Sequence, residues 1–290
     1  SGVVSICGAA AASGYESMPY DLHRVPGVTD VDGEDCEDIS SPAGFLKAVM
    51  LTLRIREGGL LAMGPDCSSF TFPNSSRHLR KVDNQWGDLG CMPVRVGNIS
   101  AVIAMFLFQL ALTRGVHCTV ENPPDSRIFH FWSETTGLLT LLQDSGACWS
   151  QTVHRCAYDS SRLPRLSKLY KFIGSWQGVK GLNARCTCNG IHRLTGSRDA
   201  ANKWTGDVVA LGESAAYPKA LGEALLRAWE QATPVPMEVR KKAGESLWPD
   251  THGSMHLGVE ASRCDGGTPP PAKRRDCTLY TSDAADDRLA

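Results

Sequence analysis

Residues 60–70 read LLAMGPDCSSF, and this stretch decides our interpretation of the fold. Its first four residues are apolar and suit a short buried strand, and Gly64 and Pro65 then end the apolar pattern. In α/β proteins, ligands bind where strands reach their carboxyl ends. Cys67 stands just past such an end, whereas a purely structural cysteine more often lies inside an apolar run. We therefore predict a strand followed by a functional loop.

Apolar segments with helical or strand spacing continue on both sides of this stretch. Helices are predicted at residues 3–13, 42–57 and 99–112, and further strands at residues 15–20 and 116–120. Residues 215–229 are predicted to form a loop at Tyr217-Pro218 and then an amphipathic helix through Leu221, Leu225 and Trp229. Strands that alternate with helices favour an α/β fold with a mostly parallel sheet and right-handed crossovers. The longest apolar run, residues 101–113, is too short to cross a bilayer. We expect it to form a buried core helix, and we expect no contact with a membrane.

The composition favours one large globular domain with a tail. The chain has 290 residues, of which 42% are hydrophobic, and its net charge is -1. We place the domain at residues 1–230 and expect residues 231–290, rich in Pro and Gly, to be disordered. Residues 279–290 we interpret as translated sequencing adapter. The irregularly spaced cysteines and the absence of a signal peptide favour reduced thiols in the nucleus or cytoplasm.

A carboxylate stands at the end of the next predicted strand. Glu121 directly follows residues 116–120, and adjacent parallel strands bring their carboxyl ends together, so Glu121 and Cys67 are expected to face one cleft. A thiol nucleophile and an acid in one cleft can cooperate in covalent catalysis. The alternative is structural, with Cys67 packed beneath its loop and Glu121 capping a turn. Spacing alone leaves both interpretations open.

The order of these motifs resembles that of the cytosine-C5 DNA methyltransferases and their phage-like relatives. The resemblance covers residues 1–229 and rests on Asp21, on Asp38-Ile39, on residues 64–70 and on Glu121-Asn122-Pro123. It implies a Rossmann-like fold and methyl transfer from S-adenosylmethionine to C5 of cytosine in nucleic acid. In that reaction Cys67 would attack C6 of the base, and Glu121 would hold and protonate N3.

The resemblance also implies a set of cofactor contacts. Asp21, with Leu22 beside it, would bind the ribose hydroxyls, and Asp38, with Ile39, would bind the adenine amino group. Gly2 would be the remnant of a glycine-rich turn whose strand is expected before Ser1 and is missing from the chain. Gly64 and Pro65 complete the predicted contacts with S-adenosylmethionine.

Two positions depart from the family pattern. Asp66 stands where the family has a proline, and its negative charge would disfavour a thiolate next to it. Pro123 stands where the family has a valine. These departures keep an alternative open, which is a non-catalytic nucleic-acid or protein binding module derived from the same fold. A nicotinamide-dependent enzyme is a weaker alternative, because the chain has no Gly-x-Gly-x-x-Gly fingerprint.

Residues 150–204 differ in charge from the rest of the chain. They contain ten lysines and arginines but two acids, a local net charge of +8, with aromatic residues interspersed. This composition is typical of segments that neutralise phosphates and stack on bases, so we predict nucleic acid, DNA in particular, as the partner. Arg155 is a predicted substrate contact. The alternative is an ordinary solvated face.

The same segment contains a group of metal-binding residue types. Cys186, Cys188 and His192 could supply three zinc ligands, with Cys156 or His154 as a fourth. The spacing is not a standard one, however, and the sequence therefore favours an ordinary loop over a zinc site.

Overall fold

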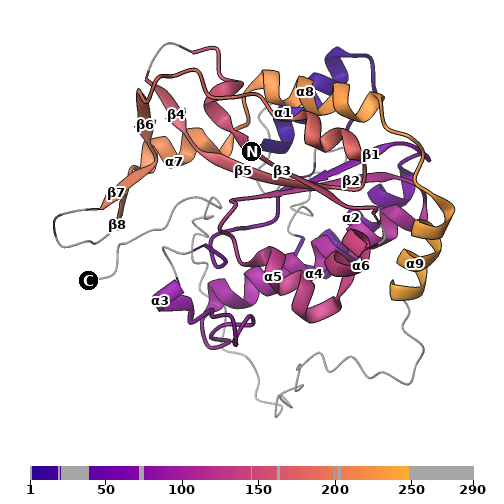
Figure 1. The fold of residues 1–290 in the computed structure, drawn as a ribbon. Coiled ribbons are helices and arrows are strands. Elements are labelled where there is room, and N and C mark those ends of the chain that lie inside the picture. Colours follow the sequence, from indigo (N-terminus) through magenta and orange to yellow (C-terminus); the bar gives the residue numbers. More distant parts are fainter. Residues whose placement is uncertain are drawn as a thin grey trace, which may run out of the picture.

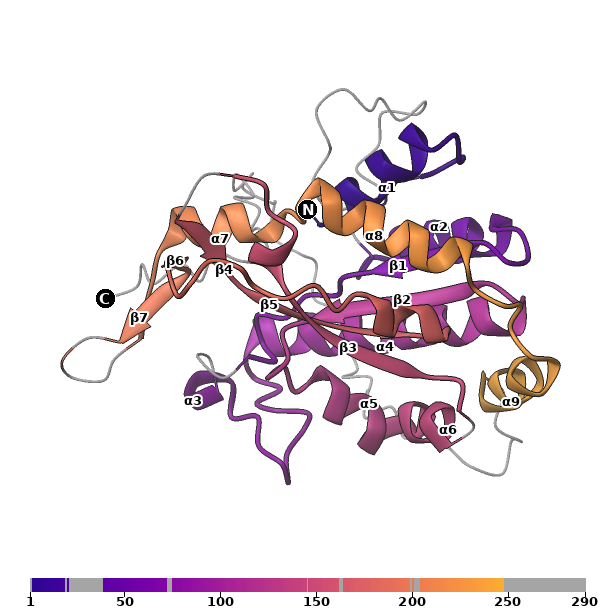
Figure 2. The same cartoon turned by 45° about the horizontal axis from the view of Figure 1, so that its top comes forward.

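The computed structural model describes residues 2–18, 20, 39–71, 75–144, 146–161, 164–198, 200 and 204–247. Three predicted cofactor contacts, Asp21, Leu22 and Asp38, lie outside the described residues, as does the predicted tail from residue 248 onward. The described part is a mixed α/β domain in which helices cover both faces of a central sheet (Figures 1 and 2).

The helices are α1 (Gly2–Ala12), α2 (Pro42–Arg54), α3 (Ser75–His78), α4 (Met92–Thr113), α5 (Ile128–Thr136), α6 (Leu138–Asp144), α7 (Val208–Ala215), α8 (Lys219–Glu230) and α9 (Met237–Leu247), with the 3-10 helices η2 (Arg155–Ala157) and η3 (Gln177–Gly181). The strands are β1 (Leu60–Met63), β2 (His117–Asn122), β3 (Trp149–His154), β4 (Arg165–Ser167), β5 (Leu169–Gly174), β6 (His192–Leu194), β7 (Gly196–Arg198) and β8 (Trp204–Gly206).

The central sheet has the strand order β1-β2-β5-β3. β1 pairs with β2 in parallel, whereas β5 pairs with both β2 and β3 in the antiparallel sense. Strands β1, β2 and β3 thus run in one direction, and β5 runs back between β2 and β3. The predicted mostly parallel sheet is not confirmed, since two of its three pairings are antiparallel. The physical reason is that the chain after β3 stays at the same end of the sheet, so β5 must return in the opposite direction.

Local signals account for several elements. The Ser41 hydroxyl accepts a hydrogen bond from the Gly44 amide (3.0 Å) at the start of α2, and Gly14 takes a positive φ of 82° after α1, as the sequence predicts. β1 has the predicted bounds. The strand predicted at residues 15–20 is wrong, because the described residues there form no strand. Their polar groups bond elsewhere, and the Tyr15 hydroxyl donates to Glu230 (3.0 Å).

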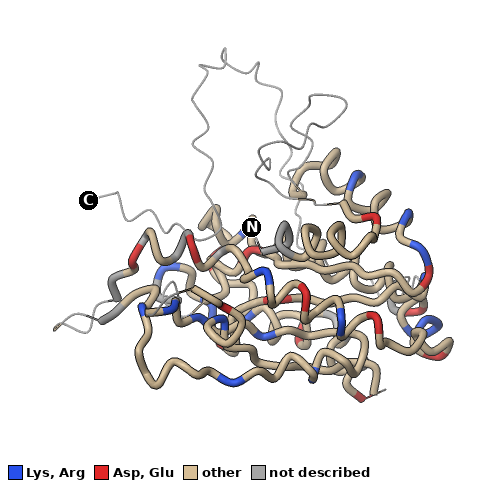
Figure 3. Tube along the Cα trace, turned by 90° about the horizontal axis from the view of Figure 1, so that it is seen from above, with Lys and Arg blue, Asp and Glu red and all other residues tan. Residues whose placement is uncertain are grey.

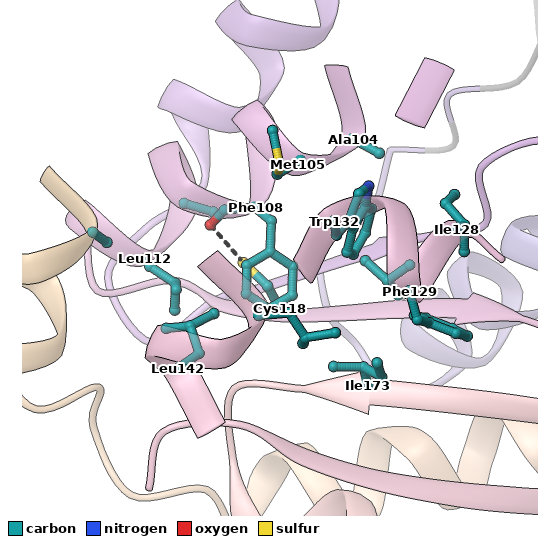
Figure 4. Close-up of a cluster of buried hydrophobic side chains, with 14 of the residues drawn as sticks. Ala104, Met105, Phe108, Leu112, Cys118, Ile128, Phe129, Trp132, Leu142 and Ile173 are labelled. Atoms are coloured by element: carbon teal, nitrogen blue, oxygen red, sulfur yellow. Dashed lines mark hydrogen bonds between the residues drawn. The ribbon is translucent and has the colours of Figure 1, made fainter. Parts of the chain in front are cut away.

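The core helix α4 extends further than the sequence predicts, from Met92 to Thr113. Its length and composition would now suffice to cross a membrane, so the length argument against a membrane fails. Its burial instead identifies a core helix. Phe108 and Leu112 pack with residues of β2, α5 and α6 in the main hydrophobic cluster, and the Cys118 thiol of β2 donates to the Phe108 carbonyl (Figure 4).

The folded domain extends beyond residue 230, where the sequence placed its end. Val235, Val239 and Ala243, in and before α9, are buried in the main cluster beside α4. Arg240 of the same helix forms an ion pair with Glu57. The boundary was set too early because α9 is highly charged, and only small apolar residues face the core.

Candidate active site

The ends of β1 and β2 bring Cys67 and Glu121 to one edge of the sheet. Met63 pairs with Val120 in parallel register, so the loop after β1 begins beside Glu121. The Asn122 side-chain amide donates to the Pro65 carbonyl (2.9 Å) and ties that loop to β2. Both Cys67 and Glu121 are half-buried, next to the exposed Gly64. A ligand can therefore reach them from solvent.

Tyr217 joins these two residues in one cluster. Its hydroxyl donates to Glu121 Oε2 (2.6 Å), and its ring packs against Tyr170 with the centroids 5.1 Å apart. Burial raises the pKa of Tyr217 well above its usual value, and the nearby Glu121 and Cys67 raise it further. The phenol therefore stays protonated and donating. We call Cys67, Glu121 and Tyr217 the Cys67 cluster.

The loop that carries Cys67 is held in a tight turn by its own side chains. Asp66 accepts hydrogen bonds from the Ser68 amide (3.0 Å) and the Ser68 hydroxyl (2.8 Å). The Phe70 amide donates to the Cys67 carbonyl (2.9 Å). Asp66 also interacts electrostatically with Arg80, so a nearby cation offsets the negative charge that the sequence places before the thiol.

Arg80 is buried beneath this loop and acts as its anchor. Its guanidinium donates to the Ser69 carbonyl (2.8 Å), the Ser69 hydroxyl (2.9 Å) and Asn98 Oδ1 of α4 (2.8 Å), and it stacks on the Phe70 ring at 3.8 Å. Burial lowers the pKa of Arg80 to about 10, so it remains a cation at neutral pH.

Helix α4 approaches the Cys67 loop closely at Gly97. A Cβ on Gly97 would stand 2.1 Å from the Ser69 hydroxyl oxygen. Only a glycine therefore lets the helix and the loop meet at this distance.

Arg155 lies at the same edge of the sheet, directly after β3, but its guanidinium serves the protein itself. It forms an ion pair with Asp159 (2.6 Å) and reaches the Glu213 carbonyl at 3.5 Å. Its Nε is buried and has no hydrogen-bond partner among the described residues. A role for Arg155 in substrate contact stays a prediction.

The described cofactor candidates lie in three places. Gly64 and Pro65 are in the Cys67 loop, and an added Cβ on Gly64 would contact the Tyr217 hydroxyl at 3.6 Å. Gly2 is the first residue of α1, and Ile39 is half-buried in the turn before α2. Among the described candidates, Gly64 and Pro65 thus lie in the loop that carries Cys67.

Part of the basic charge in residues 150–204 is neutralised inside the molecule. Arg193 pairs with Glu213 (2.6 Å) and Asp207 (3.7 Å), both of which lie at α7, and Lys168 donates to the Ser214 carbonyl (3.3 Å). Figure 3 shows Lys and Arg gathered on the side of the molecule that carries β4 and β6, with fewer acids among them. The charge that remains free is smaller than the composition implies.

Sequence reasoning missed Tyr217 and Arg80. Tyr217 precedes Pro218 and reads as a loop residue, and Arg80 stands in a polar segment that gives no sign of burial.

A separate hollow of about 250 Å³ lies at the opposite edge of the sheet, next to Gly58 and His117. That hollow is too far along the strands to belong to the Cys67 cluster.

A second group of reactive side chains lies beyond the end of β3. The ligand atoms of Cys156, Cys186, Cys188 and His192 lie within 4.8 Å of one another. Hydrogen bonds from the Cys188 amide and from neighbouring side chains lower the pKa of Cys186. The sequence offered Cys156 or His154 as a fourth ligand but favoured an ordinary loop, because the spacing of these residues is not a standard one. The structure brings Cys156 to the other three.

Comparisons with known proteins give no family for this chain. No protein-family model, curated protein or solved structure matches it. A functional interpretation therefore rests on the side chains at the site.

Proposed function

We propose that this protein transfers a methyl group from S-adenosylmethionine to C5 of cytosine in nucleic acid. The observation that carries the proposal is that Cys67 and Glu121 meet at the carboxyl ends of two adjacent parallel strands, linked through Tyr217. A thiol, a carboxyl group and a phenol at one solvent-accessible edge are a suitable set for nucleophilic attack on an aromatic ring with proton transfer.

Each residue of the Cys67 cluster has a defined task in this reaction. The Cys67 thiolate forms a bond to C6 of the cytosine, and the ring electrons move toward C5 while Glu121 delivers a proton to N3. Tyr217 holds the Glu121 carboxyl group through its 2.6 Å hydrogen bond. S-adenosylmethionine, when bound, supplies the methyl group that C5 takes up. Loss of the C5 proton to solvent, cleavage of the bond between C6 and sulfur and return of the N3 proton to Glu121 then regenerate the thiolate and the carboxylic acid.

The proposed cofactor site has only some of its residues in the part of the chain that the structure describes. Gly64 and Pro65 fit it, because they follow β1 at the edge where α/β sheets bind ligands. Asp21, Leu22 and Asp38 would hold the adenosine, together with Ile39 and Gly2. The finer fold, a Rossmann-like methyltransferase domain, is likewise a proposal.

The test is cytosine methylation by the purified protein. DNA and RNA are incubated with isotope-labelled S-adenosylmethionine, digested and assayed for labelled 5-methylcytosine. We expect product from the wild type and from Cys91→Ser, a matched change at another half-buried free cysteine, and none from Cys67→Ser. Equal product from Cys67→Ser and the wild type would refute the mechanism.

A second candidate function is the non-catalytic binding module. It is favoured by Glu121, whose Oε2 is already engaged by Tyr217, and by the Lys and Arg that residues 150–204 carry in excess over acids. This alternative predicts salt-sensitive binding to nucleic acid that Cys67→Ser leaves unchanged, with no methyl transfer.

A further inference from the structure

Four side chains from separate parts of the chain converge beyond the end of β3. Cys156 lies in η2, Cys186 and Cys188 lie in the loop before β6, and His192 is the first residue of β6. Their sulfur and nitrogen atoms lie within 4.8 Å of one another, and Cys186 Sγ is 3.2 Å from His192 Nε2. Thirty positions separate Cys156 from Cys186 in the sequence. Local chain geometry alone therefore does not bring them together.

The backbone around these residues is shaped to hold them. Asn189 and Gly190 have positive φ angles of 48° and 80°, and the Ile191 amide donates to the Cys188 carbonyl (2.9 Å), which closes a tight turn after Cys188. The Cys188 amide points at Cys186 Sγ (3.4 Å). Amide donors directed at a sulfur stabilise it as a thiolate, which is the form that binds metals.

The pairing of β4 with β6 fixes the fourth member of the group. Arg165 pairs with His192 in parallel register, so the imidazole is held by the strand pair rather than by a loop. Arg165 also donates to the Cys156 carbonyl at 3.4 Å. The strand pair and the 3-10 helix thus bring His192 and Cys156 to the same point.

The burial of the thiols also indicates that these side chains form one group inside the protein. Cys156 and Cys188 are each 1% exposed, Cys186 is half-buried, and all three are free thiols. The two-stranded sheet β4-β6 beside them is only three residues long in each strand. A sheet this short is at best marginally stable on its own.

We propose that Cys156, Cys186, Cys188 and His192 bind one zinc ion. Three thiolates and one imidazole are a typical ligand set of structural zinc sites, and Zn–S bonds of about 2.3 Å place the sulfur atoms ~3.8 Å apart in a tetrahedron. The four ligand atoms lie within 4.8 Å of one another, so shifts of about 1 Å or less bring them to that geometry. With all four positions supplied by protein, the site is closed, and its role is structural.

The zinc site would stabilise the side of the molecule that carries α7. Arg155 and Arg193 adjoin the ligands Cys156 and His192 in sequence, and they bond to Asp159 and to Glu213 of α7. From the end of α7 the chain continues to Tyr217 of the Cys67 cluster. The metal would thus support the elements that position Tyr217, although the zinc proposal does not depend on methyl transfer.

Metal analysis of the purified protein tests the proposal. Protein prepared without chelator and analysed by inductively coupled plasma mass spectrometry is expected to contain about one zinc ion per chain. Cys188→Ser and His192→Ala are expected to lose most of this zinc, whereas Cys148→Ser, a matched change at a cysteine outside the group, retains it. A wild type without bound metal, or a Cys188→Ser variant with undiminished zinc, would overturn the assignment.

Cobalt substitution keeps the test decisive if a variant fails to fold. Cobalt(II) added to metal-free wild type is expected to give thiolate charge-transfer absorption and the strong visible bands of tetrahedral coordination, and zinc then displaces it. Peptide mapping provides the opposing outcome. A disulfide between any two of Cys156, Cys186 and Cys188 in freshly isolated protein, together with an absence of cobalt absorption, would show a redox pair instead of a metal site.

Discussion

Replacement of Arg80 by methionine is the most direct test of how the Cys67 loop is held. Methionine keeps an unbranched apolar stem but is shorter than arginine, so it removes the guanidinium contact with Phe70 and every side-chain donor that Arg80 directs at the loop and at α4. The Ser69 carbonyl and Asn98 Oδ1 would lose a charged donor, as would the Gln85 and Val94 carbonyls. All of these groups lie in the interior next to the loop.

The expected loss of stability follows from these bonds. Hydrogen bonds to a charged group contribute about 1.5–3 kcal/mol each, but removal of Arg80 also relieves the cost of burying its charge. A buried acceptor left without its donor costs about 1–3 kcal/mol, and with several such acceptors we expect the unfolding free energy to fall by about 3–5 kcal/mol in total. This is a large part of the 5–15 kcal/mol that is typical of a folded domain.

Urea unfolding followed by tryptophan fluorescence measures this change. Arg95→Met is the matched control, because Arg95 is exposed on α4 and donates to the Leu89 carbonyl at the surface (2.8 Å). Its effect is expected to stay within about 0.5 kcal/mol. If Arg80→Met lowered the unfolding free energy by less than about 1 kcal/mol, Arg80 would not be the anchor of the loop.

Three further predictions follow from the structure. Tyr217→Phe removes the donor to Glu121 and is expected to lower the methylation rate about 10- to 100-fold while the protein stays folded; an unchanged rate would exclude a positioning role. A chain that ends at Thr233 lacks the buried face of α9 and should lose about 3–5 kcal/mol in urea unfolding, whereas a negligible loss would place the domain end near residue 230. Burial lowers the pKa of His78 and His117 from 6.5. As the pH falls, the unfolded chain therefore binds protons at a higher pH than the folded chain does. Stability is therefore full above pH 6.5 and should fall below it, by up to about 1.4 kcal/mol per pH unit per histidine; urea midpoints that are equal at pH 7.5 and 5.5 would contradict this.

The sequence correctly predicted the elements that depend on interactions between neighbouring residues. The Ser41 cap, the helix end at Gly14 and the apolar run of β1 depend on neighbouring residues, and the structure confirms each. The direction of β5 depends on where the chain after β3 turns, and this is a property of tertiary packing. The helix α9 was missed for a similar reason, since its few buried residues give no strong apolar period.

The residues of the candidate site also divide into those that the sequence indicates and those that only the fold brings into place. Cys67 and Glu121 could be found because each follows an apolar run in the sequence, and parallel pairing of β1 with β2 brings the ends of these runs together. Tyr217 reaches Glu121 from 96 positions away, and Arg80 owes its role to burial that its polar neighbours do not indicate. The sequence offered Cys156 and His154 as alternatives for the fourth zinc ligand, and the fold brings Cys156 to the other three.

Covalent trapping at Cys67 tests the proposed reaction most directly. Once C5 of a 5-fluorocytosine carries both fluorine and a methyl group, it has no proton to lose, so the bond between Cys67 and C6 persists. The protein is incubated with DNA that contains 5-fluoro-2'-deoxycytidine and with S-adenosylmethionine, and intact mass spectrometry detects the adduct. We predict an adduct of protein, DNA and one methyl group that maps to Cys67, requires S-adenosylmethionine and disappears in Cys67→Ser. Protein that binds both the cofactor and the DNA yet forms no adduct at Cys67 would contradict the account.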